Sequence, residues 1–240
     1  MNGFTFGDDS SWNYDLHVQR SPALSSGMRR VQSLPIVGRN GNLQLQEDAF
    51  DNFQKAYDCY FHGNMPTPAQ AHAIKSWLCR GGTYQRLEDT YDPDYFYLAC
   101  FNGPLDIDNR FNRYGICTIY FDCDPRAFRK DGEIAEEFST SGVIFNPTSF
   151  HAKPLITVTG TGPGNLYIGS FQVAVKAITD PIILDCETQH AYSKPGQAPI
   201  VNQNGNILSR PFPELVPGEN RISFDGGLTG VSLIPRWWEL

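Results

Sequence analysis

The sequence contains no run of about 18 apolar residues and no basic amino-terminal segment followed by an apolar one. It therefore predicts neither a membrane span nor a secretion signal. The six cysteines form no Cys-x-x-Cys pair, and the five histidines show no His-Glu-x-x-His spacing. These absences predict buried free thiols, folding in a reducing compartment, and no metal site. Charged residues make up only 19% of the 240 residues, and the net charge of −7 argues against a nucleic-acid-binding domain.

Acidic residues gather in one part of the chain. Between residues 85 and 137 there are twelve Asp and Glu against six Lys and Arg. The simplest interpretation is a solvated acidic face that favours solubility. The segment Asp106-Ile107-Asp108-Asn109 is similar to the start of a calcium loop, but Phe111 and Cys117 stand where that loop needs glycine and glutamate. No calcium site is therefore predicted.

The sequence also lacks a recognisable catalytic constellation. The glycine-rich segment 160–164 is superficially like a phosphate-binding loop, but Leu166-Tyr167-Ile168 follows it as a strand, where such a loop needs a helix. We interpret the segment as a hairpin turn. No pair of glycosidase carboxylates and no Ser-His-Asp set is singled out by the sequence. We predict that the protein is not an enzyme and has no catalytic or cofactor-binding residues.

Along most of the sequence, apolar and polar residues alternate with a period of two. In the run 114–122, Cys117, Ile119 and Phe121 fall on one face and polar residues on the other, which predicts a half-buried strand. Turn signals separate such runs at 40–41, 162–165, 204–205 and 225–227. Short strands at this spacing predict a mainly β fold of antiparallel hairpins, as in a sandwich or barrel.

One segment has helical periodicity. Thr67-Pro68-Ala69-Gln70 has the pattern of a capping box, with proline at the first helical position, and Gly81-Gly82 supplies a stop. An apolar stripe lies between these signals. They predict one packed helix near residues 67–80. The stripe consists of Ala71, Ile74, Trp77 and Leu78.

The chain divides into two predicted domains. The charged stretch 126–137 and the following Ser139-Thr140-Ser141-Gly142 have the composition of a linker. We expect a β domain with one helix at 1–138 and a purely β domain at 139–235. The ending holds two of the four tryptophans, each able to bury about 150 to 250 Å². Segment 236–240, through Arg236, Trp237 and Trp238, is therefore expected to return onto an earlier part of the chain or to dock on a partner. In the first case it fills the core of one domain, or it crosses back to the first domain and ties the two together.

Short motifs are distributed from one terminus to the other. They are Gly3-Phe4-Thr5-Phe6, Gly38-Arg39-Asn40-Gly41, Ile74-Lys75-Ser76-Trp77-Leu78, Gly103-Pro104-Leu105-Asp106, Asn146-Pro147-Thr148, Ala152-Lys153-Pro154-Leu155-Ile156, Gly160-Thr161-Gly162, Asp185-Cys186-Glu187-Thr188-Gln189-His190-Ala191-Tyr192, Pro217-Gly218-Glu219-Asn220 and Ile234-Pro235-Arg236-Trp237-Trp238. In this order, the set resembles the distal tail proteins, often called Dit, of long non-contractile-tailed bacteriophages. One departure is Val37, where such proteins often have proline.

The resemblance implies an N-terminal β domain with one α-helix and a long hairpin, which forms a closed ring, usually of six copies. It also implies a C-terminal galectin-like β-sandwich that projects outward. Such a ring is a structural hub at the end of the tail tube in the virion. It joins the tube to the tail-associated tip protein and, in many phages, to receptor-binding proteins, and it lets DNA pass. The chain is expected to fold and assemble in the bacterial host cytoplasm, without a cofactor.

Two hypotheses follow for individual residues. The hairpin from Val31 to Gln46 is the candidate intersubunit arm, although a hairpin can equally pack within its own domain. Its candidate contact residues are Arg39, Asn40, Leu43 and Leu45. Part of the acidic surplus would face the ring lumen, where like charge repels phosphate. The lumen candidates are Asp89, Asp92, Asp94, Asp106 and Asp108.

The alternative function is a carbohydrate-binding protein for host-surface adhesion, based on the galectin-like fold alone. A galectin-type site needs His, Asn and Arg at close alternating spacing, with a Trp beneath the sugar. The segment after His190, Ala191-Tyr192-Ser193-Lys194, contains no arginine. The hub function is therefore preferred.

Overall fold

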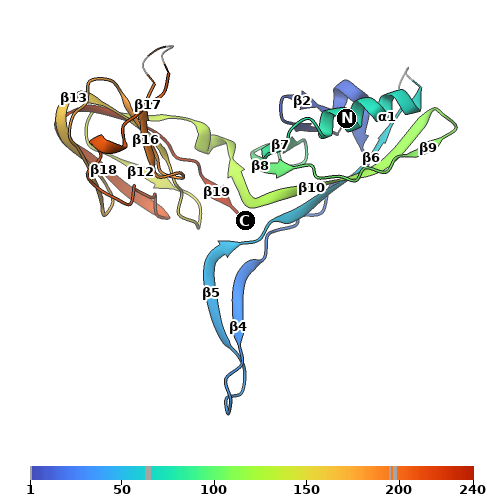
Figure 1. Cartoon of the computed structure of the whole chain (residues 1–240), viewed down its shortest axis with the longest axis horizontal. Helices are drawn as coiled ribbons and strands as arrows, with labels where there is room; N and C mark the ends of the chain where they lie inside the picture. The colour runs from blue at the N-terminus through green and yellow to red at the C-terminus, as the bar shows by residue number, and fades with distance from the viewer. Residues whose placement is uncertain (1, 63–65, 195, 197–198) are drawn as a thin grey trace. The chain divides into compact units, whose positions relative to one another are not determined.

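The computed structural model describes residues 2–62, 66–194, 196 and 199–240. The described chain is mainly β with one α-helix, which confirms the predicted fold class. Its contacts separate two compact units, Met1–Ala127 with Leu240, and Phe128–Glu239 (Figure 1). This boundary falls inside a strand, β10 (Tyr114–Arg129), whereas the sequence placed it near residue 138. The stretch 126–137 is not an open linker, because it contains the end of β10, a 3-10 turn at Lys130–Glu133 and strand β11 (Glu136–Phe138).

One antiparallel sheet organises the first unit. Its strand order is β2-β1-β7-β8-β10-β6-β3, with β9 also paired to β10. The predicted alternation in β10 is confirmed, because Cys117, Ile119 and Phe121 are all buried in the core. Strand β10 pairs with β6 from Gly115 opposite Phe61 to Cys123 opposite Phe53. The other strands are β1 (Phe4–Phe6), β2 (Asp9–Ser10), β3 (Leu16–Val18), β6 (Phe53–Phe61), β7 (Gln85–Asp89), β8 (Tyr95–Cys100) and β9 (Asp108–Arg110).

The helix α1 (Thr67–Leu78) packs on this sheet through the predicted stripe. Ile74, Trp77 and Leu78 are buried, and the Trp77 indole N–H donates to the Phe6 carbonyl at 3.2 Å. The capping-box prediction is wrong, because the N-cap residue is Pro66 and no side chain caps the helix. The Gln70 amide instead faces inward and donates to the Tyr14 carbonyl at 2.6 Å.

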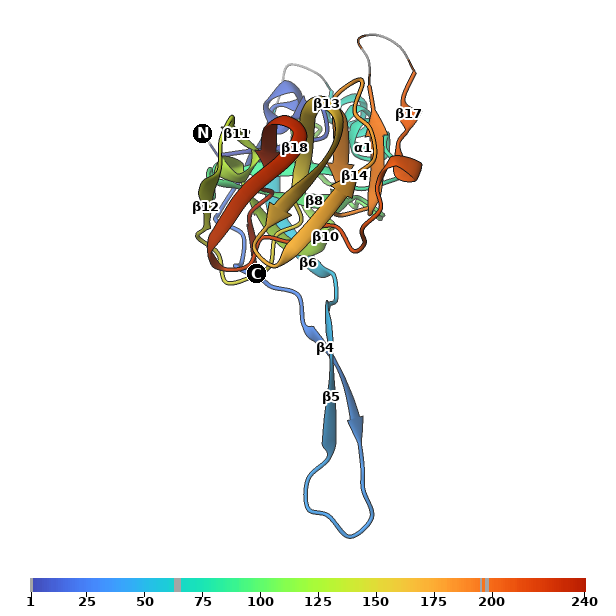
Figure 2. The ribbon, with the colours of Figure 1, turned by 90° about the vertical axis from the view of Figure 1, so that its left-hand side faces the viewer.

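A two-stranded arm, β4 (Arg29–Leu34) and β5 (Leu43–Phe50), belongs to the first unit (Figures 1 and 2). In the described chain, these strands pair only with each other. Asn40-Gly41 does not form a two-residue hairpin turn. The hydrogen-bonded turn lies earlier, where the Arg39 N–H donates to the Ile36 carbonyl at 3.2 Å. Gly38, with φ of 82°, supplies the positive φ that a type II turn needs at its third residue.

The sheet of the second unit has the order β11-β18-β13-β15-β16-β17, with β12 also paired to β18 and β14 to β13. Among the residues described, 21 buried ones form its core, from Ile144 to Trp237. The strands of this sheet not yet described are β12 (Gly142–Asn146), β13 (Leu155–Ile168), β14 (Phe171–Val175), β15 (Ile182–Asp185), β16 (His190–Ser193), β17 (Val201–Asn202) and β18 (Gly218–Ile234). The last strand, β19 (Trp238–Glu239), pairs with β10 instead.

The long strands β13 and β18 run side by side along their length and bend together (Figure 2). The interpretation of 160–164 as a hairpin turn is wrong, because this segment is an irregularity inside β13. The register shifts there, and a Cβ on Gly227 would lie 2.0 Å from the Thr161 carbonyl oxygen. Glycine inside a strand therefore marks a close approach of two backbones at a bend, rather than the end of a strand.

All six cysteines lie in the described residues and are free thiols. Burial raises the pKa of Cys117 to about 12 and that of Cys123 to about 12, so these thiols are unreactive at neutral pH. No helix among the described residues has the length and hydropathy needed to span a membrane.

Candidate assembly surfaces

The arm presents an apolar face to solvent. Leu34 lies opposite Leu43, and Gln32 lies opposite Leu45. Because directly paired residues share a face of the ladder, Leu34, Leu43 and Leu45 stand on the same side, 36 to 45% exposed. We call these three residues the leucine face. The sequence placed Leu43 and Leu45 together, but it missed Leu34, since cross-strand register is invisible in one sequence.

Polar side chains lie beside the leucine face and at the base of the arm. The Gln32 side-chain amide donates to Glu47 at 3.1 Å, which places Glu47 beside the leucines. At the base of the arm, Arg30 pairs with Asp51 at 2.6 Å. The predicted contact residues Arg39 and Asn40 lie in the exposed connection between the two strands, apart from the leucine face.

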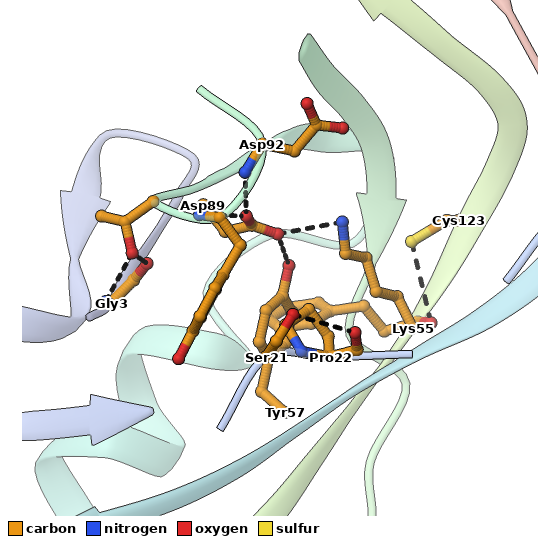
Figure 3. Close-up of polar contacts among 11 residues, drawn as sticks. Gly3, Ser21, Pro22, Lys55, Tyr57, Asp89, Asp92 and Cys123 are labelled. Carbon is orange, nitrogen blue, oxygen red and sulfur yellow. Dashed lines mark hydrogen bonds and ion pairs between the residues drawn. The ribbon is translucent and has the colours of Figure 1, made fainter. Parts of the chain in front are cut away.

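Asp89 was predicted to face a lumen, but it is buried in the first unit, and its side chain is 2% exposed. Figure 3 shows the carboxylate held between Lys55 and Tyr57. The Lys55 ammonium lies 2.9 Å from the carboxylate, and the Tyr57 hydroxyl donates to it at 2.6 Å. The backbone N–H groups of Tyr91 and Asp92 donate to its other oxygen at 2.9 and 3.0 Å. Asp89 therefore stabilises the core and contributes no surface charge.

The electrostatics of this network favour an ionised Asp89. Burial opposes its charge, but the Lys55 ammonium and the Tyr57 hydroxyl outweigh burial, so the pKa of this carboxyl lies below its usual value. Burial and the neighbouring carboxylate raise the pKa of Tyr57 well above its usual value. The Lys55 ammonium also lies 4.2 Å from the centre of the Tyr97 ring. Every charge in the network thus has a partner, as a low-dielectric site requires.

The other acidic candidates differ from Asp89 in exposure. Asp94 and Asp106 are exposed, and Asp92 is half-buried. Asp108 is exposed but forms an ion pair with Arg110 at 2.8 Å. Only part of the acidic surplus between residues 85 and 137 is therefore available as free surface charge. The same pairing of an acid with an arginine two residues away recurs at Asp124 with Arg126 and at Asp131 with Arg129.

The predicted anchor residues near the C-terminus pack within the second unit. Trp237 is 4% exposed and belongs to the core of that unit. The Arg236 guanidinium lies 2.7 Å from the Asp185 carboxylate. The backbone N–H of Arg236 donates to the Gly132 carbonyl at 2.8 Å. The Trp237 carbonyl accepts from the Arg129 N–H at 2.9 Å. Arg129 and Gly132 lie inside the range predicted for the first domain, but the contacts assign them to the second unit.

Trp238 is held less deeply. Its ring stacks on Phe150 with centroids 4.3 Å apart, and its indole N–H donates to the His151 carbonyl at 2.9 Å. Glu239 lies 3.4 Å from Arg129. The three anchor residues predicted from the sequence are thus brought together, and their described contacts stabilise the second unit itself.

The described residues contain no group of three or more His, Cys, Asp or Glu side chains placed to hold a metal ion.

Three solved structures are similar to this chain over nearly its whole length. The Dit protein of phage SPP1, described as a hub of the adsorption apparatus in phages that infect Gram-positive bacteria, matches with a TM-score of 0.76 and 14% identity, covering 100% of both chains. A chain of the phage P2 baseplate, activated with Ca, matches with a TM-score of 0.58 and 9% identity over 98% of each chain.

The phage P2 baseplate activated with Sr gives a TM-score of 0.53 at 9% identity, covering 97% of this chain and 98% of that one. No protein-family model matches the sequence, and no curated protein matches it. The resemblance to the distal tail proteins is thus confirmed at the level of the fold.

Proposed function

We propose that this protein is the structural hub of a phage tail tip. Six copies form a closed ring at the distal end of the tail tube. The ring joins the tube to the tip protein and to receptor-binding proteins, and it leaves a passage for DNA. The observation that carries this proposal is the match in fold to the hub protein of phage SPP1, which covers both chains completely.

The arm supplies a physical means of closing such a ring. A head-to-tail interface that closes on itself gives cyclic symmetry. In this proposal the arm is the element of each copy that contacts the next copy. The leucine face is exposed in the single chain, although burying leucine is favourable. Covering this face with a neighbouring copy removes apolar surface from water at each interface of the ring.

The exposed carboxylates Asp94 and Asp106 are the remaining lumen candidates. Negative charge on the lumen wall would repel DNA phosphates and prevent DNA from binding during passage. The net charge of −7 has the sign expected for a protein that must not retain DNA. Locating both carboxylates on the outer rim of an assembled ring would contradict this assignment.

The partners follow from the hub position: the tube protein on one side, the tip protein on the other, and receptor-binding proteins at the periphery. The protein acts in the virion, at the tail tip, after folding and assembling in the host cytoplasm. Buried free thiols such as Cys59 and Cys186 suit assembly in that reducing compartment. The function is geometric and involves no catalysis.

Light scattering behind a sizing column, at several protein concentrations, tests the ring. We expect a discrete species near six times 26.9 kDa. The test variant replaces Leu43 and Leu45 by serine. The matched control replaces Gln44 and Gln46 by serine, since these glutamines lie on the opposite face of the arm. Loss of the large species in the leucine variant alone supports arm-mediated closure. A strictly monomeric wild-type chain, even when mixed with tube protein, would contradict the ring.

A further inference from the structure

An apolar stripe follows the outer face of β10 in the first unit. Tyr114, Ile116 and Tyr120 are 49, 40 and 46% exposed and alternate with residues buried in the core. The fourth residue of this face, Thr118, donates to Asp58 at 2.8 Å. At about 3.4 Å per residue, the stripe is about 20 Å long. This is enough to receive another extended strand along its length.

The hairpin between β9 and β10 ends in an exposed aromatic residue. Phe111 is 90% exposed, and it adopts φ of 56°, followed by Asn112 at 55°. The Arg113 N–H donates to the Arg110 carbonyl at 3.1 Å, so the turn has the type I′ form. That form favours asparagine and glycine, and a bulky residue with positive φ is uncommon. The turn thus displays an apolar ring to solvent in a backbone conformation that phenylalanine itself disfavours.

A positive charge lies at one end of the stripe. Arg113, beside Phe111, is exposed, and no described carboxylate lies within ion-pair distance of its guanidinium. The leucine face of the arm carries the opposite sign at its own end, because Glu47 is held there by Gln32. The chain therefore displays two exposed apolar stripes whose ends bear complementary charges.

We infer that the leucine face of one copy docks on the β10 stripe of a second copy, with Glu47 facing Arg113. This deepens the proposed ring and rests on it, because it names the surface that receives the arm. The charge pair sets the register. With Glu47 at Arg113, Leu45 lies beside Tyr114 and Ile116, and Leu43 lies further along β10. Phe111 caps the end of the docked arm.

Charge exchange tests the pairing. Arg113→Glu is expected to weaken assembly about two- to fivefold or more, since an exposed ion pair contributes little and like charges repel. Adding Glu47→Arg should restore the wild-type dissociation constant, measured by light scattering over a dilution series. The matched control reverses Arg110, which already pairs with Asp108 in its own chain. A double variant no tighter than Arg113→Glu alone would overturn the pairing.

Disulfide trapping tests the register. In a background with Cys79 and Cys100 replaced by serine, Leu45→Cys with Ile116→Cys should form a cross-link between chains under mild oxidation. Gln44→Cys with Ile116→Cys is the control, because Gln44 lies on the opposite face of the arm. Equal trapping of both pairs, or of neither, in a protein that still assembles would overturn the inference and leave the ring intact. A protein that does not assemble at all would contradict the ring and the inference together.

Discussion

Replacing Lys55 by methionine is expected to destabilise the first unit by about 3 to 5 kcal/mol, because the charge of Asp89 then stays buried without its counter-ion. The side chains of Lys55 and Asp89 are 7 and 2% exposed, so water cannot screen the loss. Asp89 retains its hydrogen bonds from Tyr57 and from two backbone N–H groups. We therefore expect a value in the lower half of this range.

A second variant separates the charge from the packing. Lys55→Met with Asp89→Asn removes both charges, while the asparagine oxygen still accepts from the backbone. This pair should regain most of the stability, since removing a buried pair together is often nearly neutral. The buried thiols give a readout specific to each unit. Cys123 lies in the core of the first unit and Cys186 in that of the second.

Thiol labelling over a denaturant series, followed by mass spectrometry of the peptides, measures each unit separately. The midpoint for Cys123 should fall in the Lys55→Met variant, while the midpoint for Cys186 stays unchanged. A loss of less than about 1 kcal/mol, on the scale of an exposed ion pair, would refute the buried-charge reasoning.

The buried ion pair also sets the sign of the pH dependence of stability. In the folded state the pKa of Asp89 is lowered despite burial, and the Lys55 ammonium is the principal cause of the lowering. The ionised carboxylate therefore contributes fully to the free energy of unfolding at pH values above the ordinary carboxyl pKa. This contribution is lost as the pH falls through the lowered pKa that Asp89 has in the folded state. In Lys55→Met this lowering disappears, and the penalty should shrink between about pH 7 and about pH 4 as Asp89 takes up a proton. A penalty that is constant over this range would contradict the mechanism.

Three further predictions concern the second unit and the arm. Trp237→Ala should cost about 3 to 5 kcal/mol, seen as labelling of Cys186 at lower denaturant, because it empties a buried site in the core. Gly227→Ala should lower the stability of the second unit by about 1 to 3 kcal/mol in the same assay, since the new methyl would lie 2.0 Å from the Thr161 carbonyl oxygen. The control Gly205→Ala should leave the stability unchanged, because no atom of the described residues beyond its chain neighbours lies within 4 Å of the added methyl. Val37→Pro should stabilise the arm by about 0.4 to 1 kcal/mol, because proline suits the second position of a type II turn, and it should slow trypsin cleavage between β4 and β5.

Local patterns in the sequence predicted the elements well. The alternation around Ile119 predicted β10, and the stripe through Trp77 predicted α1. Both signals arise because one face of an element is buried, which is visible within a few residues. The glycines at 160–164 were misread because glycine favours both a turn and a close approach of strands. Only the position of β18 next to β13 shows that these glycines allow a close approach of two strands and do not form a turn.

Contacts between distant residues could not be predicted. Asp89 is neutralised by Lys55, 34 positions earlier, and a count of charges along the chain cannot detect that pairing. Leu34 joins the leucine face through its register with Leu43, which depends on an eight-residue connection rather than a tight turn. The sequence therefore located the arm but not the full composition of its apolar face.

The position of the boundary between the units has a mechanical consequence. The second unit begins at Phe128, inside β10, so a force applied to it along that strand reaches the ladder between β10 and β6 directly. That ladder runs from Gly115 opposite Phe61 to Cys123 opposite Phe53. Its hydrogen bonds lie across the strand direction and would share the load in shear instead of opening one at a time. Because β10 itself continues into the second unit, with no flexible linker at the boundary, such a force would act directly on the core sheet of the first unit.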